Sequence, residues 1–119
     1  MANPNIVSVT SIKGKTIGAS LGTTSTAYVT NSASSSEVYK VNTIIASNVT
    51  ASTTYQVNIQ LTTSAGTFYI VKALDVPADS SVVVLDKNSN IYLEEGMILK
   101  AFASGANGID LFISYEEIA

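Results

Sequence analysis

A run of alternating polar and apolar residues at positions 55–62 constrains the fold more than any other stretch of this chain. In an extended backbone its apolar and polar side chains occupy opposite faces: Tyr55, Val57, Ile59 and Leu61 against Gln56, Asn58, Gln60 and Thr62. We therefore predict a β-strand at 55–63 with one face in the core. We expect the other face, with Gln56, Asn58 and Gln60, to lie in solvent.

Comparable short runs, separated by turn residues, recur along the chain, and none shows helical periodicity. The other predicted strands are 6–12, 27–30, 38–47, 67–76, 82–86, 91–93, 97–104 and 109–117. We expect a glycine-containing connection at 14–20, a hairpin turn at 64–66 and a last hairpin turn at 105–108. The remaining connections are polar and lie at 31–36, 48–53, 77–80, 87–90 and 94–96.

Eight or nine short strands joined by turns are typical of an all-β, antiparallel β-sandwich or jelly roll, with a small barrel as the alternative. A chain of 119 residues is long enough for one independent core. We therefore predict a single domain over 1–119. Because chain termini are free to reach outward, residues 1–8 are candidates for an extended N-terminal arm.

The residue types that this chain lacks exclude several functions. It contains no histidine, cysteine, tryptophan or arginine. Disulfides, thiol chemistry and cysteine-ligated zinc are therefore excluded, and a serine nucleophile has no histidine base. The six lysines are scattered and the formal net charge is −3, which argues against nucleic-acid binding. We expect no enzyme activity, catalytic residue, cofactor or metal, and we recognise neither a secretion signal nor a run long enough to span a membrane.

The carboxylates are the one remaining route to acid–base chemistry. Glu94–Glu95 and Glu116–Glu117 are adjacent pairs. Neighbours in a strand point to opposite faces, so neither pair forms a catalytic dyad by itself. A hydrolase would need two acids from different strands facing each other across a cleft. The first pair, followed by Gly96, is better explained as a solvated turn.

Two further motifs each have a simpler structural explanation. The stretch 86–90 imitates the start of a calcium loop, but Ile91 replaces the required glycine and Met97 the bidentate glutamate. We predict a polar β-turn there, with a weak calcium site as the alternative. Asn48-Val49-Thr50 matches the glycosylation triplet, which in a threonine-rich chain without a secretion signal is better explained as a chance match.

Several predicted strands are apolar on both faces. In 67–76, Phe68, Ile70 and Leu74 alternate with Tyr69, Val71 and Ala73, and apolar neighbours also occur at Ile44-Ile45 and Phe102-Ala103. Central strands with imperfect alternation are one explanation. The other is a second buried surface that contacts another subunit.

Stretches along most of the chain resemble known virion proteins. They are residues 2–16, 39–42, 76–80, 86–88, 91–96 and 114–118. In these stretches the sequence resembles small virion structural proteins of marine tailed phages, especially phages of cyanobacteria. The resemblance implies a non-enzymatic β-sandwich located in the virion, and most directly a capsid decoration (cement) protein. Such proteins commonly sit as trimers on the outside of the shell, where they clamp neighbouring capsomers.

We therefore expect a homo-oligomer, with a trimer favoured, that contacts the major capsid protein or other virion proteins. The alternative is a carbohydrate- or receptor-binding β-sandwich of a tail or fibre, with exposed tyrosines in a groove. The predicted interface residues belong to the N-terminal segment: Asn3, Pro4, Asn5, Ile6 and Val7. The loops 31–36 and 105–108 are further candidates for contact surfaces.

Overall fold

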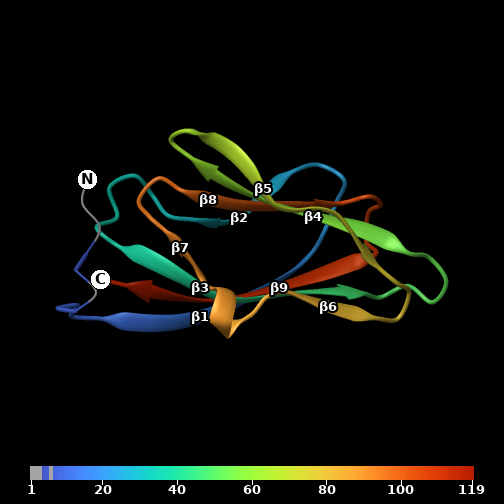
Figure 1. Ribbon diagram of the computed structural model, residues 1–119, viewed down its shortest axis with the longest axis horizontal. Helices are drawn as coiled ribbons and strands as arrows, with labels where there is room; N and C mark the ends of the chain where they lie inside the picture. The colour runs from blue at the N-terminus through green and yellow to red at the C-terminus, as the bar shows by residue number, and fades with distance from the viewer. Residues whose placement is uncertain (1–3, 6) are drawn as a thin grey trace.

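The computed structural model describes residues 4, 5 and 7–119, and in this part of the chain nine strands form two antiparallel sheets (Figure 1). The strands are β1 (Ile12–Ser20), β2 (Thr26–Thr30), β3 (Val38–Asn48), β4 (Tyr55–Thr63), β5 (Gly66–Val76), β6 (Ser81–Leu85), β7 (Ile91–Leu93), β8 (Ile98–Ala103) and β9 (Ile109–Ile118). One short 3-10 helix, η1 (Lys87–Ser89), lies between β6 and β7. This confirms the predicted all-β sandwich and its strand count.

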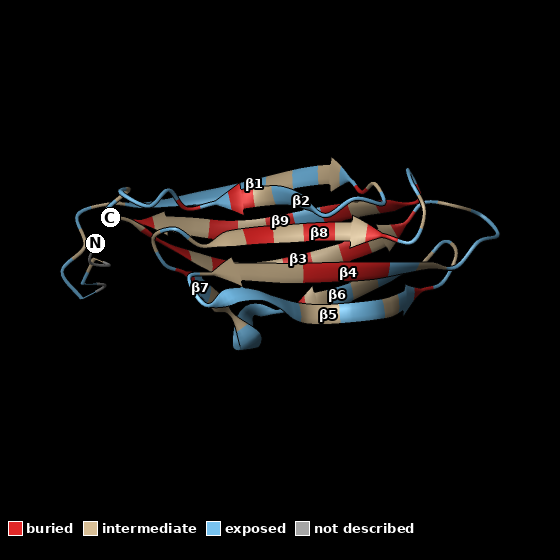
Figure 2. Ribbon diagram, turned by 90° about the horizontal axis from the view of Figure 1, so that it is seen from above, coloured by how far each residue is buried: buried red, intermediate tan, exposed pale blue. Residues whose placement is uncertain are grey.

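The two sheets stack face to face. Sheet A has the order β1-β9-β3-β6, with β7 also paired to β3, and sheet B has the order β2-β8-β4-β5. Strands β6 and β7 lie along the same side of β3, near its opposite ends. Viewed from above, each strand of sheet B lies over its counterpart in sheet A, so that β8 lies over β9 and β4 over β3 (Figure 2).

The inner faces of both sheets form one hydrophobic core. In β9 the buried residues Ile109, Leu111, Ile113 and Tyr115 alternate with more accessible ones, as the sequence pattern predicted. They face buried residues of sheet B such as Val57, Ile59 and Leu99. Burial of large aliphatic side chains stabilises the fold by roughly 1.5–3 kcal/mol each. This core therefore fixes which side of every strand faces outward.

The N-terminal strand was predicted wrongly. The connection expected at 14–20 is β1, which pairs with β9 from Ile12↔Ile118 to Ser20↔Asp110. Residues 7–11 of the predicted strand 6–12 contain a turn and bends instead. The glycines misled the prediction, because Gly14 and Gly18 occupy outward positions of an edge strand, where no core packing is lost.

The last predicted hairpin was also wrong. Strands β8 and β9 lie in different sheets, so residues 104–108 cross from one sheet to the other. The ring of Tyr55 lies against both Gly105 and Gly108, where an added Cβ would overlap it. Sequence spacing could not reveal this crossover, because a turn of this length also suits a hairpin.

The polar face predicted for β4 is only partly in solvent. Gln56 is exposed, but Asn58 is buried beside an irregularity in the pairing of β4 with β5. The Asn58 side-chain oxygen accepts a hydrogen bond from the backbone N–H of Ala73 at 2.9 Å. Ala73 has φ 54, the left-handed region that non-glycine residues rarely adopt. A bulge in the edge strand thus covers an asparagine that simple alternation places in water.

Candidate interaction surfaces

The N-terminal segment, where the sequence predicted an interface, is described from Pro4 with a gap at position 6. Pro4 is half-buried and Asn5 exposed, and the Asn5 side-chain oxygen accepts a hydrogen bond from the N–H of Val7 at 3.0 Å. The Val7 side chain is 89% exposed. Asn3 and Ile6 lie outside the described residues. The interface at these five positions stays a prediction.

The sheet is tied to the C-terminus immediately after this segment. The backbone N–H groups of Thr10 and Ser11 both donate to the carbonyl of Ala119, at 2.8 and 3.1 Å. The N–H of Ala119 in turn donates to the carbonyl of Ser11 at 2.9 Å. Hydrogen bonding to the sheet therefore reaches as far as Thr10, and the predicted arm at 1–8 precedes it.

The serine-rich loop at 31–36 is anchored by a buried asparagine. The Asn31 side-chain nitrogen donates to the carbonyls of Glu37 and Leu93, each at 2.9 Å, and its oxygen accepts from the Ser35 hydroxyl. The loop backbone also donates from Ser36 to the Glu95 carboxylate at 2.9 Å. Residues 32–34 and Ser36 of this loop are exposed, whereas Asn31 is buried and Ser35 half-buried. It offers less free surface than its composition suggested.

The opposite end of the sandwich has a matching anchor at Asn48. Its side-chain nitrogen donates to the carbonyls of Thr53 and Val76 at 2.7 and 2.8 Å, and its oxygen accepts from both the N–H and the hydroxyl of Thr50. Because this nitrogen is buried and fully engaged, the folded chain cannot be glycosylated there. The chance-match interpretation of the triplet agrees with this geometry.

The connection at 105–108 is also largely structural. Gly105 and Gly108 hold the Tyr55 ring, while the backbone N–H of Asn107 donates to Leu21 at 3.1 Å. The carbonyl of Gly108 accepts from Val49 at 3.0 Å. Only Ala106 and Asn107 are exposed, so this predicted contact surface reduces to a two-residue tip.

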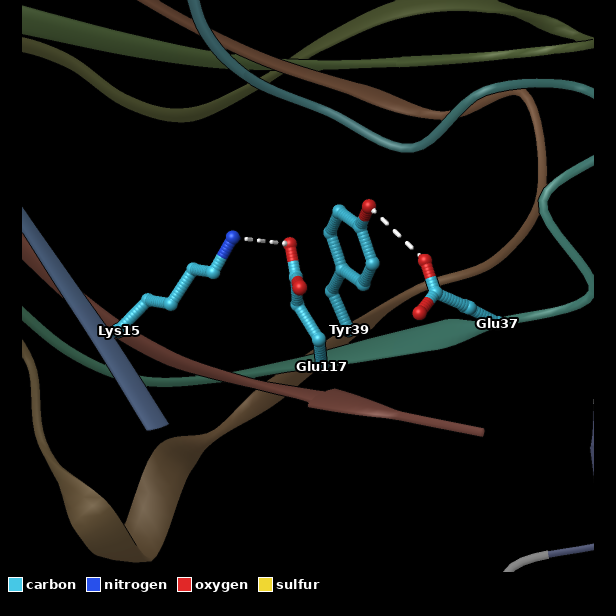
Figure 3. Close-up of polar contacts among 4 residues, drawn as sticks. All are labelled: Lys15, Glu37, Tyr39 and Glu117. Atoms are coloured by element: carbon cyan, nitrogen blue, oxygen red, sulfur yellow. Dashed lines mark hydrogen bonds and ion pairs between the residues drawn. The ribbon is translucent and has the colours of Figure 1, made fainter. Parts of the chain in front are cut away.

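The last two glutamates point in different directions, as the strand geometry predicted. Glu117 forms an ion pair with Lys15 at 3.2 Å (Figure 3), whereas Glu116 accepts a hydrogen bond from Asn42 at 3.0 Å. Glu95 accepts from the Ser36 N–H, and its other carboxylate oxygen is buried without a hydrogen-bond partner. Among the described residues, no three acidic, histidine or cysteine side chains form a cluster that could hold a metal ion.

Two buried tyrosines lie beside this ion pair. The ring centroids of Tyr39 and Tyr115 are 5.6 Å apart, and the Tyr39 hydroxyl donates to Glu37 at 3.4 Å (Figure 3). Burial raises the pKa of Tyr39 to about 12, and the nearby Glu117 and Glu37 carboxylates raise it further in the same direction. Burial also raises the pKa of Tyr115. Both shifts favour the neutral form of the phenol in the folded protein.

The stretch that imitates a calcium loop forms a capped 3-10 turn. The Asp86 carboxylate accepts a hydrogen bond from the N–H of Asn88 at 2.9 Å, and the Asn90 side chain donates to the carbonyl of Lys87 at 3.2 Å. The sequence predicted a polar β-turn here, which differs only in the type of turn. Asp86 thus has a local structural role as the N-cap of η1.

The outer face of sheet A carries an apolar row that crosses four strands. Phe112 of β9 lies between Gly18 of β1 and Ile45 of β3, and Ile45 is paired with Val83 of β6. Since Leu111 and Ile113 point into the core, Phe112 points outward, with 45% of its surface exposed. Val83 is 58% exposed. We call Gly18, Phe112, Ile45 and Val83 the apolar row.

Three polar rows accompany the apolar row on this face. Thr16, Ser114 and Thr43 form a hydroxyl row; Gly14, Glu116, Lys40 and Tyr92 form a charged row; Ser20, Asp110, Ser47 and Ser81 form an end row. Hydroxyls within these rows bond to one another, at 3.3 Å from Thr16 to Ser114 and at 2.9 Å between Ser47 and Ser81. This reduces the cost of removing the face from water.

The outer face of sheet B has a different composition. Its central strands present Gln60, Lys100 and Thr62, with the half-buried Phe102 beside Asn58 and the half-buried Ile98 beside Thr62. The exposed large apolar residues of this sheet are Phe68 and Tyr69, both on the edge strand β5. The Lys72 ammonium lies 5.4 Å from the centre of the Tyr69 ring, a distance that permits a cation–π contact.

Comparisons with known proteins do not assign the chain. No protein-family model matches it, and no curated protein matches it in sequence. In the part of the chain that the structure describes, no helix is long and apolar enough to cross a membrane.

Sequence reasoning identified two-sided apolar strands but missed the apolar row. Ile45 was noticed because it follows Ile44, whereas Phe112 was hidden between Leu111 and Ile113. The row exists only because the register places Gly18, Phe112, Ile45 and Val83 side by side. A single-strand pattern carries no information on register across four strands, so the sequence held no sufficient signal.

Proposed function

We propose that this protein is a non-enzymatic structural component of a phage virion, a capsid decoration protein that acts by surface contact. The observation that carries the proposal is the outer face of sheet A, where an apolar row crosses strands at the centre of an exposed sheet. Exposed apolar patches bordered by polar residues mark interaction sites. The similarity of the sequence to small virion proteins of marine tailed phages supports the same function.

The use of the polar side chains supports this proposal over a catalytic function. Asn31 and Asn48 are fully engaged in holding the ends of the sandwich. Glu116 and Glu117 have separate partners on opposite faces of β9. What this chain presents to its surroundings is shape and hydrogen-bonding surface, which is what a protein that reinforces a shell requires.

The location of the chain in a particle tests this proposal directly. Antibodies against the folded protein should label the outside of purified virions of the phage that encodes it, in regular positions over the capsid. Mass spectrometry of the same particles should detect the chain at many copies per capsid. Purified virions without the chain would contradict the proposal, and labelling confined to the tail or fibre would favour the alternative below.

A carbohydrate- or receptor-binding module is the second candidate, and Tyr69 is the observation that favours it. Its ring is exposed on the outer side of sheet B, and the paired Gln60 side chain accepts a hydrogen bond from Ser25 at 2.7 Å. An exposed aromatic ring beside amide and hydroxyl groups suits a sugar ring. Glycan-array binding that is lost in Tyr69→Ala would support this candidate, and an array without hits would count against it.

The N-terminal segment is the predicted arm of the decoration protein. Deleting residues 1–8 leaves the hydrogen bonds of Thr10 and Ser11 to Ala119 available. We expect the truncated protein to retain its melting temperature but to bind empty capsids of the same phage less tightly in co-sedimentation. Unchanged capsid binding after this deletion would remove the arm from the proposal.

A further inference from the structure

The outer face of sheet A is complementary to itself in a specific way. Its rows run across the strands in the order β1, β9, β3 and then β6 or β7. A two-fold axis close to the strand direction, between β9 and β3, would bring this face onto the same face of a second copy. Each row would then meet the same row in reversed order, so β9 faces β3 and β1 faces β6 or β7.

This reversed order matches the charged groups. In the charged row, Glu116 of β9 would face Lys40 of the second copy, and Lys40 would face its Glu116. The symmetry creates this opposite-charge pair twice. At the end of the row, Gly14 of β1 would lie opposite the large Tyr92 ring of β7. Opposite charges that meet across an interface favour one orientation over others.

The apolar row matches in the same arrangement. Phe112 would face Ile45 of the second copy, and Gly18 would face its Val83. The Phe112 ring already leans over Gly18, because a Cβ added to that glycine would lie 3.1 Å from the ring. The large exposed side chains therefore meet small or apolar ones rather than charges. In the hydroxyl row, Ser114 would face Thr43.

The edges of the face also fit each other. The helix η1 stands out at the β6/β7 edge of sheet A (Figures 1 and 2). The two-fold axis places this edge beside β1 of the second copy. Apart from the exposed Ile12 at its start, the outward residues of β1 are small, with Gly14, Thr16 and Gly18 in succession, and a Cβ at Gly14 would meet nothing within 4 Å. There is room for η1 at the edge that would receive it.

The size of the face suits a pair of copies. Four strands about 4.8 Å apart and about nine residues long cover roughly 600 Å² of projected area. Stable interfaces bury about 600–1,000 Å² on each partner. The face therefore reaches the lower limit for a stable dimer, which predicts association that depends on concentration.

We propose that a second copy of this chain covers the outer face of sheet A, through a two-fold interface centred between β9 and β3. This deepens the proposed function, and it rests on that function only for the premise that the chain acts by surface contact. A two-fold interface produces pairs of chains, whereas the resemblance to decoration proteins implies trimers. The mass of the assembly in solution distinguishes the two.

Sedimentation equilibrium of the full chain, from about 1 μM to about 1 mM, covers the affinities of weak complexes. We expect the mass to rise from 12.4 kDa to twice that value. Phe112→Glu should weaken the dimer at least about tenfold, because it places a charge in the apolar row. The matched control is Tyr69→Glu on sheet B, which replaces an aromatic residue of nearly equal exposure and should leave the dimer intact.

Charge reversal tests the orientation of the two copies. Lys40→Glu and Glu116→Lys should each weaken the dimer, and the double variant should restore it to within about threefold of the original affinity. Far-UV circular dichroism checks that each variant is folded. If Phe112→Glu does not fold, single cysteines provide the second measurement, because the chain contains none of its own.

Ser114 lies near the proposed axis, so the test variant is Ser114→Cys. The matched control is Thr62→Cys on sheet B, because the hydroxyl of each of these residues is hydrogen-bonded to a hydroxyl of a neighbouring strand. A short bismaleimide should link two copies of Ser114→Cys and not of Thr62→Cys. A monomer at 1 mM, a mass of three chains, or equal loss in Phe112→Glu and Tyr69→Glu would overturn the proposal. A monomer that still labels virions would overturn the dimer alone, and a dimer absent from virions would overturn the virion location alone.

Discussion

The two sheets of the sandwich present outer faces of different character. On sheet A, apolar side chains occupy neighbouring positions on the central strands β9 and β3 and continue onto β6. On sheet B, the corresponding central strands carry Gln60, Lys100 and Thr62 beside the half-buried Ile98 and Phe102, and the exposed rings are confined to the edge strand β5. The difference between the two faces shows that strand register decides whether exposed apolar residues form a continuous surface. A row across central strands forms a surface, whereas residues on one edge form only a border.

The largest effect that sharpens this comparison concerns two neighbours on β9. Ile113 points into the core and Phe112 points out of it. Ile113→Ala should lower the free energy of unfolding by about 2–5 kcal/mol, because it leaves a cavity. Phe112→Ala should cost less than about 1 kcal/mol in the monomer while it weakens the dimer. Urea unfolding of dilute protein measures the free energy of unfolding of both variants. Equal losses in the two variants would contradict the assignment of Ile113 to the core and of Phe112 to the outer face.

The next effect concerns Tyr39, on the inner side of sheet A. Its pKa is raised to about 12 in the folded protein from the ordinary tyrosine value of 10.0, so the folded state holds the phenol proton more tightly. The contribution of the neutral Tyr39 phenol to the free energy of unfolding is complete below pH 10 and is lost as the pH rises through 12. It amounts to about 2–3 kcal/mol at most.

Tyr39→Phe should therefore show a smaller fall in unfolding free energy than the original chain between pH 9.5 and 12. Urea unfolding across this range measures the difference between the two proteins. The burial that we assign to the Tyr39 ring would be contradicted by identical pH profiles.

A smaller effect tests the bulge that distinguishes sheet B. Asn58→Ala removes the acceptor for the Ala73 N–H and should cost about 1–3 kcal/mol. Ala73→Gly is the complementary variant, because glycine adopts the left-handed conformation without strain. It should be neutral or stabilise the protein by up to about 1 kcal/mol. Thermal melts measure both variants, and a destabilising Ala73→Gly would show that the bulge is not strained.

The smallest effects separate two glycines on the outer side of β1. A Cβ at Gly14 meets nothing, so Gly14→Ala should stabilise the monomer by up to about 0.5–1 kcal/mol. In Gly18→Ala the new methyl group must displace the Phe112 ring by a few tenths of an ångström. This variant should gain less stability in thermal melts and should weaken the dimer more than Gly14→Ala does. A larger gain in stability and a smaller loss of dimer affinity in Gly18→Ala than in Gly14→Ala would argue against the position of the Phe112 ring.

Sequence patterns predicted the strands best where core burial and alternation coincide. β4 and β9 were located almost to the residue, because Ile59, Leu111 and their neighbours repeat with period two. β1 was missed because its outward positions carry glycine. Its pairing with β9 holds the segment as an extended strand, which its composition alone does not predict. Partnership between distant strands, rather than local preference, decided this element.

The candidate surface was the least predictable part of the molecule. The apolar row needs the register of β1, β9, β3 and β6, with residues from Gly18 to Phe112 in one line. The predicted loop surfaces are smaller than the sequence suggested, because polar residues that were expected at the surface are buried in the fold. Asn31 and Asn48 look like ordinary loop residues in the sequence, but each is buried and holds two backbone carbonyls.

The most direct test of the account is a dilution series followed by nuclear magnetic resonance of methyl and aromatic groups. The central claim is that a second copy covers the outer face of sheet A. It predicts that signals of Ile45, Val83 and Phe112 shift with concentration, while those of Ile98 and Phe102 on sheet B stay constant. Signals that do not move, or shifts confined to Phe68 and Tyr69 on β5, would contradict it.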